Sequence, residues 1–324
     1  MISVIIPNYN NANYVSDSIE SVVNQSFIDW ELIVVDDLST DNSWDVIQTY
    51  VRKFDNISSF KNYSNKKGGS VCRNIGLEKS KGSYVLFLDS DDVLSNFCLK
   101  NRFEAIDIKE NLDFYVNPMA TFYNEIGDSN FIWNQFEGNH LIRFLSHNLP
   151  WQTMMVLWKK DALINLNGFD VDFCRLQDVE LHTRALLFNL KYKINSSFPA
   201  DCYYRIDEKR FSIDYSSYLE NKIDGSIIYI YKFLDLLDNL NKKQMSKYLK
   251  GTFFVILSEI CLAFVLKKID ENEKNFLIED FLKKSSTLIY SKKDNLLVSI
   301  YLFLNKFKLR IKGVNYLFKM LIIS

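Results

Sequence analysis

The chain has 324 residues, of which 48% are apolar and 15% aromatic, and its formal net charge is −1. This composition predicts a folded globular protein with one large core or two moderate ones, and it excludes a disordered chain. A near-neutral chain has no global basic field, so we expect no nucleic-acid partner. The five cysteines are widely spread and contain no C-x-x-C pair, which argues against a disulfide framework or a zinc site and favours a reducing cytosol.

Strand-like and helix-like segments alternate over the first hundred residues. Mostly apolar runs predict four strands, the third weaker than the others: Ile2–Ile6, Glu31–Val35, Ser58–Tyr63 and Tyr84–Leu88. Apolar residues at helical spacing predict helices between them, around residues 15–23, 44–54 and 69–79. This alternation predicts an α/β fold with a parallel sheet and helices on both faces. Because Met1 leads directly into the first strand, we expect no cleavable signal sequence.

Three carboxylates, Asp89, Asp91 and Asp92, follow the strand Tyr84–Leu88 directly. Ligands bind at the carboxyl ends of strands in an open parallel sheet, so these acids lie where chemistry is expected. Carboxylates this close repel one another unless a cation holds them, and Mg²⁺ takes one or two carboxylates while substrate phosphates complete its shell. The pattern therefore indicates a nucleoside diphosphate and a divalent metal. A plainer interpretation stays open, in which Asp91 or Asp92 only caps a helix beginning near Asn96.

A second acidic pair, Asp36 and Asp37, follows the strand Glu31–Val35 and is expected at the same edge of the sheet, although a turn or helix cap explains it equally well. The first strand leads into Pro7-Asn-Tyr-Asn, and the chain contains neither G-x-G-x-x-G there nor a P-loop motif anywhere. This argues against a dinucleotide site. The segment Gly68–Arg73 opens a helix and offers N–H groups and a guanidinium to an anion, or is an ordinary loop.

The segment Asn101–Asp207 is less regular and predicts a second subdomain against the sheet. A helix is predicted over Leu176–Leu187. Asp178 stands near its start, where a solvated acid favoured by the helix dipole is the plain alternative to a functional one. The three histidines lack metal-ligand spacing, and a polar surface position explains His182.

From about residue 216 the strands fade, and residues 216–324 are predicted to form a helical region. Its most apolar stretch, Thr252–Leu266, is interrupted by Glu259 and is shorter than a membrane span, so it predicts a buried helix. From Lys283 onward, nine basic residues are opposed by one acid, with aromatic and aliphatic residues between them. This basic tail is predicted either to meet an anionic membrane surface, which we favour, or to pack on the enzyme with a solvated lysine face.

Four motifs make the chain resemble the inverting family 2 glycosyltransferases, which have the A-type nucleotide-diphospho-sugar transferase (GT-A) fold. The motifs are S-V-I-I-P-N-Y-N from Ser3, E-L-I-V-V-D-D-L-S-T-D from Glu31, Y-V-L-F-L-D-S-D-D from Tyr84, and G-F-D followed by L-Q-D-V-E-L-H-T-R-A-L from Leu176. The resemblance covers about the first two thirds of the chain. It implies a Rossmann-like GT-A domain over residues 1–215, with a nucleotide-sugar half (1–100) and an acceptor and catalytic half (101–215).

The resemblance also implies roles for single residues on the donor side. Pro7 and Tyr9 are expected to line the nucleobase, and Asp37 to accept a hydrogen bond from the base ring. Arg73 matches a basic residue near the nucleotide. Asp89 is expected to reach the ribose or the donor sugar.

For the chemistry, the resemblance implies that Asp91 holds Mg²⁺ or Mn²⁺, that Asp92 is an outer member of the cluster, and that Asp178 is the catalytic base. Such a metal stabilises the charge on the leaving diphosphate, while the base takes a proton from the attacking hydroxyl, which gives inversion. A helix start lowers the pKa of a carboxyl group and weakens it as a base, unless burial offsets this. The chain departs from the family pattern at Gln177, where an acid is usual, and at Asp207, where a histidine is usual. The second departure puts the metal or diphosphate contacts of that loop in doubt.

The expected partners are a nucleotide-sugar donor, most simply a UDP-sugar, and a glycan or lipid-linked glycan acceptor in surface polysaccharide synthesis. We expect a cytoplasmic enzyme that attaches peripherally to the inner face of the cell membrane. A sugar nucleotidyltransferase is an alternative, but it requires a glycine-rich basic loop where Pro7-Asn-Tyr-Asn stands. A non-catalytic sugar-nucleotide-binding scaffold is another, and the presence of both Asp91 and Asp178 argues against it. No motif indicates which sugar, acceptor or linkage is used.

Overall fold

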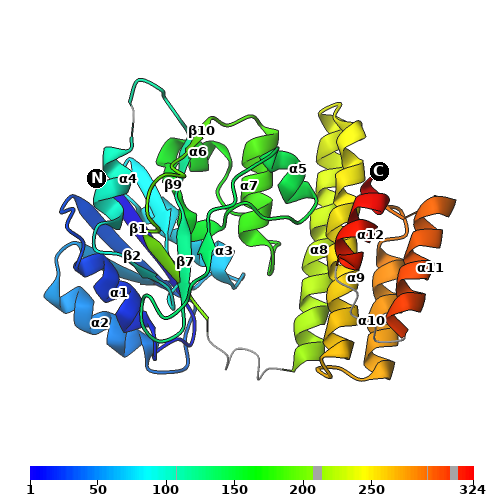
Figure 1. Cartoon of the computed structure of the whole chain (residues 1–324). Helices are drawn as coiled ribbons and strands as arrows, with labels where there is room; N and C mark the ends of the chain where they lie inside the picture. Colours follow the sequence, from blue (N-terminus) through cyan, green and yellow to red (C-terminus); the bar gives the residue numbers. More distant parts are fainter. Residues whose placement is uncertain (107, 207–213, 290, 307–312) are drawn as a thin grey trace. The chain divides into compact units, whose positions relative to one another are not determined.

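The computed structural model describes residues 1–106, 108–206, 214–289, 291–306 and 313–324 (Figure 1). The chain divides into two compact units. The first unit contains Met1–Gly138 and Pro150–Asp207, and the second contains Asn139–Leu149 and Glu208–Ser324. A short segment from the middle of the chain therefore belongs to the second unit.

A seven-stranded sheet forms the centre of the first unit. Its strands are β1 (Ile2–Asn8), β2 (Trp30–Asp36), β3 (Ile57–Lys61), β4 (Tyr84–Phe87), β6 (Phe114–Val116), β9 (Val156–Lys159) and β10 (Tyr192–Ile194). Their order across the sheet is β10-β6-β9-β4-β1-β2-β3. The strands β1 to β4 run parallel, and β9 runs antiparallel to both of its neighbours, β4 and β6. The predicted parallel-rich sheet is confirmed.

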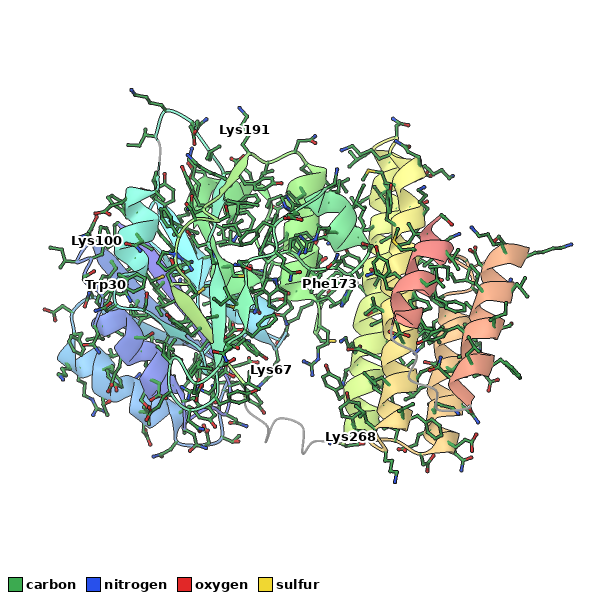
Figure 2. The ribbon with its side chains drawn as sticks, viewed as in Figure 1. Trp30, Lys67, Lys100, Phe173, Lys191 and Lys268 are labelled. Atoms are coloured by element: carbon green, nitrogen blue, oxygen red, sulfur yellow. The ribbon has the colours of Figure 1, made fainter. Side chains whose placement is uncertain are left out.

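Both faces of the central strands are covered, which explains their continuous apolar runs. The residues of β1 from Ile2 to Ile6 are fully buried, and helix α3 (Gly69–Lys79) packs on β1 and β2. Gly76 permits this close packing, because a Cβ atom there would lie 2.3 Å from Cγ2 of Ile5. Figure 2 shows side chains filling the space between the sheet and its helices, with Trp30 at the start of β2. The start of α3 is thereby fixed at the carboxyl edge of the sheet.

The remaining helices of the first unit surround the sheet. They are α1 (Val15–Val23), α2 (Ser43–Lys53), α4 (Cys98–Glu104), α6 (Lys160–Asn165), α7 (Gln177–Leu187) and the 3₁₀ helix η1 (Thr153–Met155). The helices predicted over residues 15–23, 44–54, 69–79 and 176–187 are confirmed to within one residue at each end, as α1, α2, α3 and α7.

A smaller four-stranded sheet in the first unit was not predicted. Its strands, in spatial order, are β5 (Val93–Leu94), β11 (Cys202–Arg205), β7 (Met119–Phe122) and β8 (Ile132–Trp133). Strands of two to four residues are too short to show a periodic pattern, so only their long-range pairing defines them. This sheet matters for function because β5 and β11 flank the turn that follows β4.

Helices make up the second unit, as predicted. They are α5 (His140–Leu145), α8 (Tyr215–Asn239), the 3₁₀ helix η3 (Lys243–Tyr248), α9 (Leu249–Val265), α10 (Glu271–Lys284), α11 (Lys292–Lys306) and α12 (Val314–Ile323). Helix α9 is central, because α8, α10 and α12 all pack on it. In the described part of the chain, Lys243–Val265 is long and apolar enough to cross a membrane, and 56% of its most apolar window is buried. This apolar segment is longer than the predicted stretch Thr252–Leu266, because η3 and the first turn of α9 extend it at its N-terminal end.

Candidate active site

The carboxyl ends of β1, β2 and β4 meet at one edge of the large sheet. In the parallel register of β1 and β2, Asn8 lies opposite Asp36, and the Asp37 N–H donates a 2.8 Å hydrogen bond to the Asn8 carbonyl. Because β4 pairs with β1 on the other side, Asp89 follows its strand on the same edge. The structure therefore brings the two acidic strand ends together, as predicted.

The acidic pair after β2 anchors the loops at this edge. Asp36 is fully buried and accepts a 2.8 Å hydrogen bond from the Asn8 amide. Asp37 accepts 2.7 Å hydrogen bonds from the Asn62 amide and from the Gly68 N–H, one on each carboxylate oxygen. A carboxylate oxygen has a second lone pair. Asp37 therefore holds the loop before α3 and keeps acceptor capacity.

The end of β1 presents one aromatic ring to solvent. Tyr9 is 57% exposed, whereas Pro7 is half-buried. The next residue, Asn10, has a φ of 48°, and its side-chain oxygen accepts a 2.7 Å hydrogen bond from the Thr40 N–H. The chain after β1 is thus tied to the loop after β2, and this positions the exposed ring at the acidic edge.

The acid turn (Asp89–Asp92) contains carboxylates in three different environments. The Asp89 side chain is 42% exposed, while Asp91 and Asp92 are 5% and 1% exposed as residues. Asp92, expected as an outer member of the cluster, is the most deeply buried and accepts a 2.8 Å hydrogen bond from the Arg205 N–H. Burial raises the pKa of the Asp92 carboxyl group well above its usual range, and the negative charge of Asp89 adds to this effect.

Arg205 of β11 holds the acid turn, a role that sequence reasoning missed. Its Nε donates a 2.8 Å hydrogen bond to the Asp91 carbonyl, and its guanidinium pairs with Asp17 at 2.7 Å. The guanidinium carbon also lies 4.6 Å from the centre of the Tyr14 ring and 4.5 Å from that of Phe122. No local pattern in the sequence indicates this role, because Asp17 and Asp91 lie far from Arg205 along the chain.

Arg73 of α3 joins the acid turn to the start of α7. One Nη pairs with Asp89 at 2.5 Å, and the other donates a 2.6 Å hydrogen bond to the Gln177 side chain. Gly69 leaves room for this arrangement, because a Cβ atom there would lie 2.8 Å from the guanidinium. The guanidinium also lies over the Phe169 ring, at 5.2 Å. One side chain thus gathers elements that are distant in sequence.

Asp178 is the second residue of α7 and neighbours this cluster. The helix is preceded by Leu176 with φ 59° and ψ 28°, a left-handed conformation that costs free energy for leucine. Burial raises the pKa of the Asp178 carboxyl group, although the Arg73 guanidinium and a hydrogen bond from the Val179 N–H oppose the shift. Burial therefore outweighs the helix start, which was expected to weaken this residue as a base.

A buried ion pair fixes α7 against the turn that precedes it. Glu180 and Arg184 form two hydrogen bonds of 2.6 and 2.8 Å, and Arg184 also donates to the carbonyls of Leu166 and Gly168. Phe173, on the loop before α7, is buried as well (Figure 2). The segment that carries Asp178 is therefore held rigidly.

The surface position predicted for His182 is wrong. His182 is 1% exposed and stacks on Trp158 with ring centres 5.8 Å apart. Burial lowers the pKa of its imidazole to about 3, so it stays neutral at physiological pH. His182 is therefore a core residue, and it lies on the face of α7 that packs on the sheet.

The carboxylates of the acid turn suit a divalent metal that takes its other ligands from a bound substrate. Within the described ranges, no group of three or more His, Cys, Asp or Glu side chains could hold a metal by itself. Asp89 and Asp91 still offer hard carboxylate oxygens in the number that Mg²⁺ takes when phosphates supply other ligands. Asp89 also pairs with Arg73 at 2.5 Å. Asp207 lies outside the described residues.

Comparison with known proteins identifies the family. The model described as Glycosyl transferase family 2 matches residues 3–165, half of the chain. The chain belongs to glycosyl transferase family 2. The matched region of this family 2 chain includes the acid turn and ends before α7, so Asp178 lies beyond it.

Sequence relatives include named glycosyltransferases. The poly(ribitol-phosphate) beta-glucosyltransferase of Bacillus spizizenii is 39% identical over 100 residues, which cover 30% of this chain and 16% of that protein. Glycosyltransferase GlyG of Streptococcus pneumoniae serotype 4 is 26% identical over 229 residues, which cover 70% and 73%. The chain spans about half or less of the length of several curated relatives that it matches.

Solved structures show the fold. The crystal structure of Staphylococcus aureus TarS 1–349 in complex with UDP-GlcNAc matches with a TM-score of 0.63 and 22% identity, covering 87% of this chain and 81% of that one. Mannosyltransferase PcManGT from Pyrobaculum calidifontis, in complex with GDP-Man and Mn²⁺, matches with a TM-score of 0.52 and 15% identity, covering 95% and 86%. The predicted GT-A fold is confirmed.

Proposed function

We propose that the chain transfers a sugar from a UDP-sugar to a hydroxyl group of a glycan or lipid-linked glycan, with inversion, in surface polysaccharide synthesis. One observation carries this proposal: Arg73 contacts both Asp89 and Gln177, so it holds the acid turn beside the helix of Asp178. The UDP-GlcNAc complex of TarS supports the donor class, and the names of the relatives support a polymer acceptor. The first unit is then the glycosyltransferase domain.

The donor nucleotide is proposed to bind along the strand ends. The exposed Tyr9 ring and the half-buried Pro7 offer a flat apolar surface for the base. The spare lone pairs of Asp37 suit the ring N–H of uracil. Asp89 would reach the ribose or the sugar, and Arg73 beside it adds a positive charge near the diphosphate.

Catalysis is proposed to use Asp91 and Asp178 on opposite sides of the sugar. Asp91 would hold Mg²⁺ or Mn²⁺, which when bound offsets the charge that develops on the diphosphate. Asp92 and Arg205 keep the backbone of the acid turn in place. Asp178 accepts the proton of the acceptor hydroxyl as that oxygen attacks the anomeric carbon. The bond from this carbon to the diphosphate oxygen breaks, and UDP leaves with the electron pair, so the configuration inverts without a covalent intermediate.

The test is a panel of UDP- and GDP-sugars with Mg²⁺ or Mn²⁺, read by nucleotide release and by protection against thermal unfolding. We expect one UDP-sugar to be hydrolysed slowly and to raise the unfolding temperature most. If nucleotides protect the protein but none is turned over with any glycan acceptor, the non-catalytic scaffold is the better account. Preference for GDP-sugars contradicts the proposed base recognition.

We also propose that the C-terminal helices attach the enzyme to an anionic membrane at the inner face of the cell membrane. Lys292 and Lys293 are exposed, and the acid between these lysines and the chain end, Asp294, is buried in an ion pair with Lys250 at 2.8 Å. Exposed apolar residues accompany them: Leu296, Phe303, Tyr316, Leu317 and Met320. Basic and apolar side chains together favour binding to anionic lipid. Lys308, Arg310 and Lys312 lie outside the described residues.

Flotation of the full chain with anionic liposomes tests this attachment. We expect the double variant Phe303→Ser/Tyr316→Ser to float less than wild type, and binding to weaken between low and moderate salt. Ile28→Ser is the matched control, because Ile28 is 89% exposed in the first unit. Equal flotation of all three proteins, or none by wild type, contradicts attachment through this tail.

A further inference from the structure

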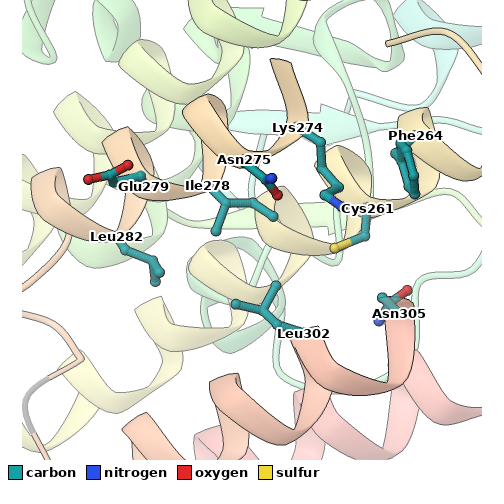
Figure 3. A pocket seen from close by; sticks show the side chains of 9 residues that line it. All are labelled: Cys261, Phe264, Lys274, Asn275, Ile278, Glu279, Leu282, Leu302 and Asn305. Carbon is teal, nitrogen blue, oxygen red and sulfur yellow. The ribbon is translucent and has the colours of Figure 1, made fainter. Parts of the chain in front are cut away.

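Three helices of the second unit line a partly open cavity of about 280 Å³ (Figure 3). Its apolar lining residues are Cys261 and Phe264 of α9, Ile278 and Leu282 of α10, and Leu302 of α11. Ligand pockets range over about 300–1,000 Å³, so this cavity lies just below that range and has room for a single alkyl chain. None of its lining residues belongs to the candidate active site.

One ammonium group lines this apolar cavity. The Lys274 side chain is 10% exposed, its Nζ lies 4.1 Å from the centre of the Phe264 ring, and Figure 3 shows it ending beside Cys261. Its ion-pair partner, Glu271, is 3.6 Å away and 71% exposed. Within the described part of the chain, no oxygen accepts a hydrogen bond from Lys274 Nζ. A buried ammonium has three donors and is costly to leave without acceptors.

The other polar groups at the cavity do not satisfy this cation. Asn275 and Glu279 are exposed, and the Asn305 amide donates its hydrogen bond to the Tyr301 carbonyl at 2.8 Å. Burial raises the pKa of the Cys261 thiol to about 12, so this group stays neutral and acts as part of the apolar wall. The cavity therefore combines an apolar interior with one incompletely hydrogen-bonded cation.

We propose that this cavity binds a single-chain amphiphile with an anionic head group, such as an alkyl phosphate. The chain lies against Phe264, Ile278 and Leu302, and the head group accepts hydrogen bonds from Lys274. Charge-assisted hydrogen bonds between an ammonium and an anionic head group are stronger than neutral ones, and each buried methylene adds about a fourfold gain in affinity. The site is independent of the sugar-nucleotide site, so it does not rest on the proposed function.

Calorimetry on the full chain tests the apolar chain and the anionic head group of the proposed ligand separately. The titrants are octyl phosphate, octanol and inorganic phosphate, each below its aggregation concentration. Of these three ligands we expect octyl phosphate to bind most tightly, and decyl phosphate, with two more methylenes, should bind about 15-fold more tightly than octyl phosphate. Lys274→Met should weaken octyl phosphate at least tenfold without affecting octanol. Lys268→Met is the matched control, because Lys268 is exposed in the turn after α9 and should bind as wild type does.

A substitution that fills the cavity provides a second test of the proposal. Leu302→Trp should abolish binding, whereas Phe276→Trp, at a 62% exposed position on α10, should not. The chemical shift of the Ile278 Cδ1 methyl group in wild-type protein should change when octyl phosphate binds. This readout does not depend on how the variants fold. Binding of inorganic phosphate as tight as that of octyl phosphate would reduce the site to a simple anion site and overturn the proposal. Equal binding by all four variants, an unmoved Ile278 methyl signal, or no binding by wild type would also overturn it.

Discussion

Asp178 is the residue on which the proposed chemistry depends most. Asp178→Asn keeps the side-chain volume but removes the base, so turnover should fall by about two to four orders of magnitude while donor affinity stays nearly unchanged. Initial rates and calorimetry with the same donor measure the two effects separately. Asp172→Asn is the matched control, because Asp172 is an exposed acid in the preceding loop, paired with Lys66. Wild-type turnover by Asp178→Asn would leave Asp178 as only a helix-start acid.

The pH profile should reveal the environment of this base. A base works only when ionised, and burial raises the pKa of Asp178, so kcat/KM should fall on the acid side above the ordinary aspartate pKa of about 3.9. Gln177→Glu puts a carboxylate beside Arg73. The negative charge of this carboxylate offsets the positive charge of Arg73, which favours the ionised form of Asp178. The acid limb should therefore move to higher pH in this variant. Gln177→Met, which adds no charge, is the control, and an acid limb that stays in place or moves down contradicts the assignment.

At the scale of elements, the long buried strands were predictable and the short ones were not. The run Ile2–Ile6 is apolar because two layers cover it, and that pattern is visible locally. The strand β11 is four residues long, and it is defined by pairing with β5 and β7. Arg205 could not be placed for the same reason, since its partners come from α1 and the acid turn.

A second long-range ion pair stabilises the smaller sheet. Arg102 of α4 and Asp201 are almost completely buried and form two hydrogen bonds of 2.9 and 2.6 Å, and Arg102 also donates to the Met154 carbonyl. Arg102→Met leaves the Asp201 carboxylate unpaired, so the free energy of unfolding should fall by about 3–5 kcal/mol. Urea unfolding of the full chain measures this change.

The double variant Arg102→Met/Asp201→Leu tests whether the unpaired Asp201 carboxylate causes the loss of stability. Removing both partners of a buried pair is often nearly neutral, so the double variant should recover most of the lost stability. If it is as unstable as Arg102→Met, the Met154 contact and packing, rather than the unpaired charge, account for the loss.

At the scale of the whole molecule, local motifs predicted the candidate site residues, but they did not predict the long-range contacts that position these residues. Asp37, Asp89, Asp91 and Asp178 could be proposed as site residues because each stands in a local motif beside a strand or helix end. Arg73 was proposed from the resemblance, and its contact with Gln177 depends on a fold that brings α3 to α7. The membership of 139–149 in the helical unit has no local signal, because packing on distant helices determines it.

The central claim is that the acid turn binds a nucleoside diphosphate together with a divalent metal. Calorimetric titration of UDP into the full chain, with and without Mn²⁺, tests it most directly. Wild type and the control Asp45→Ala, which changes an exposed acid on α2, should bind UDP much more tightly when Mn²⁺ is present. Asp91→Ala should lose this metal-dependent gain and keep the weaker metal-free affinity. Equal UDP affinities of wild type and Asp91→Ala, both with and without Mn²⁺, would contradict the account.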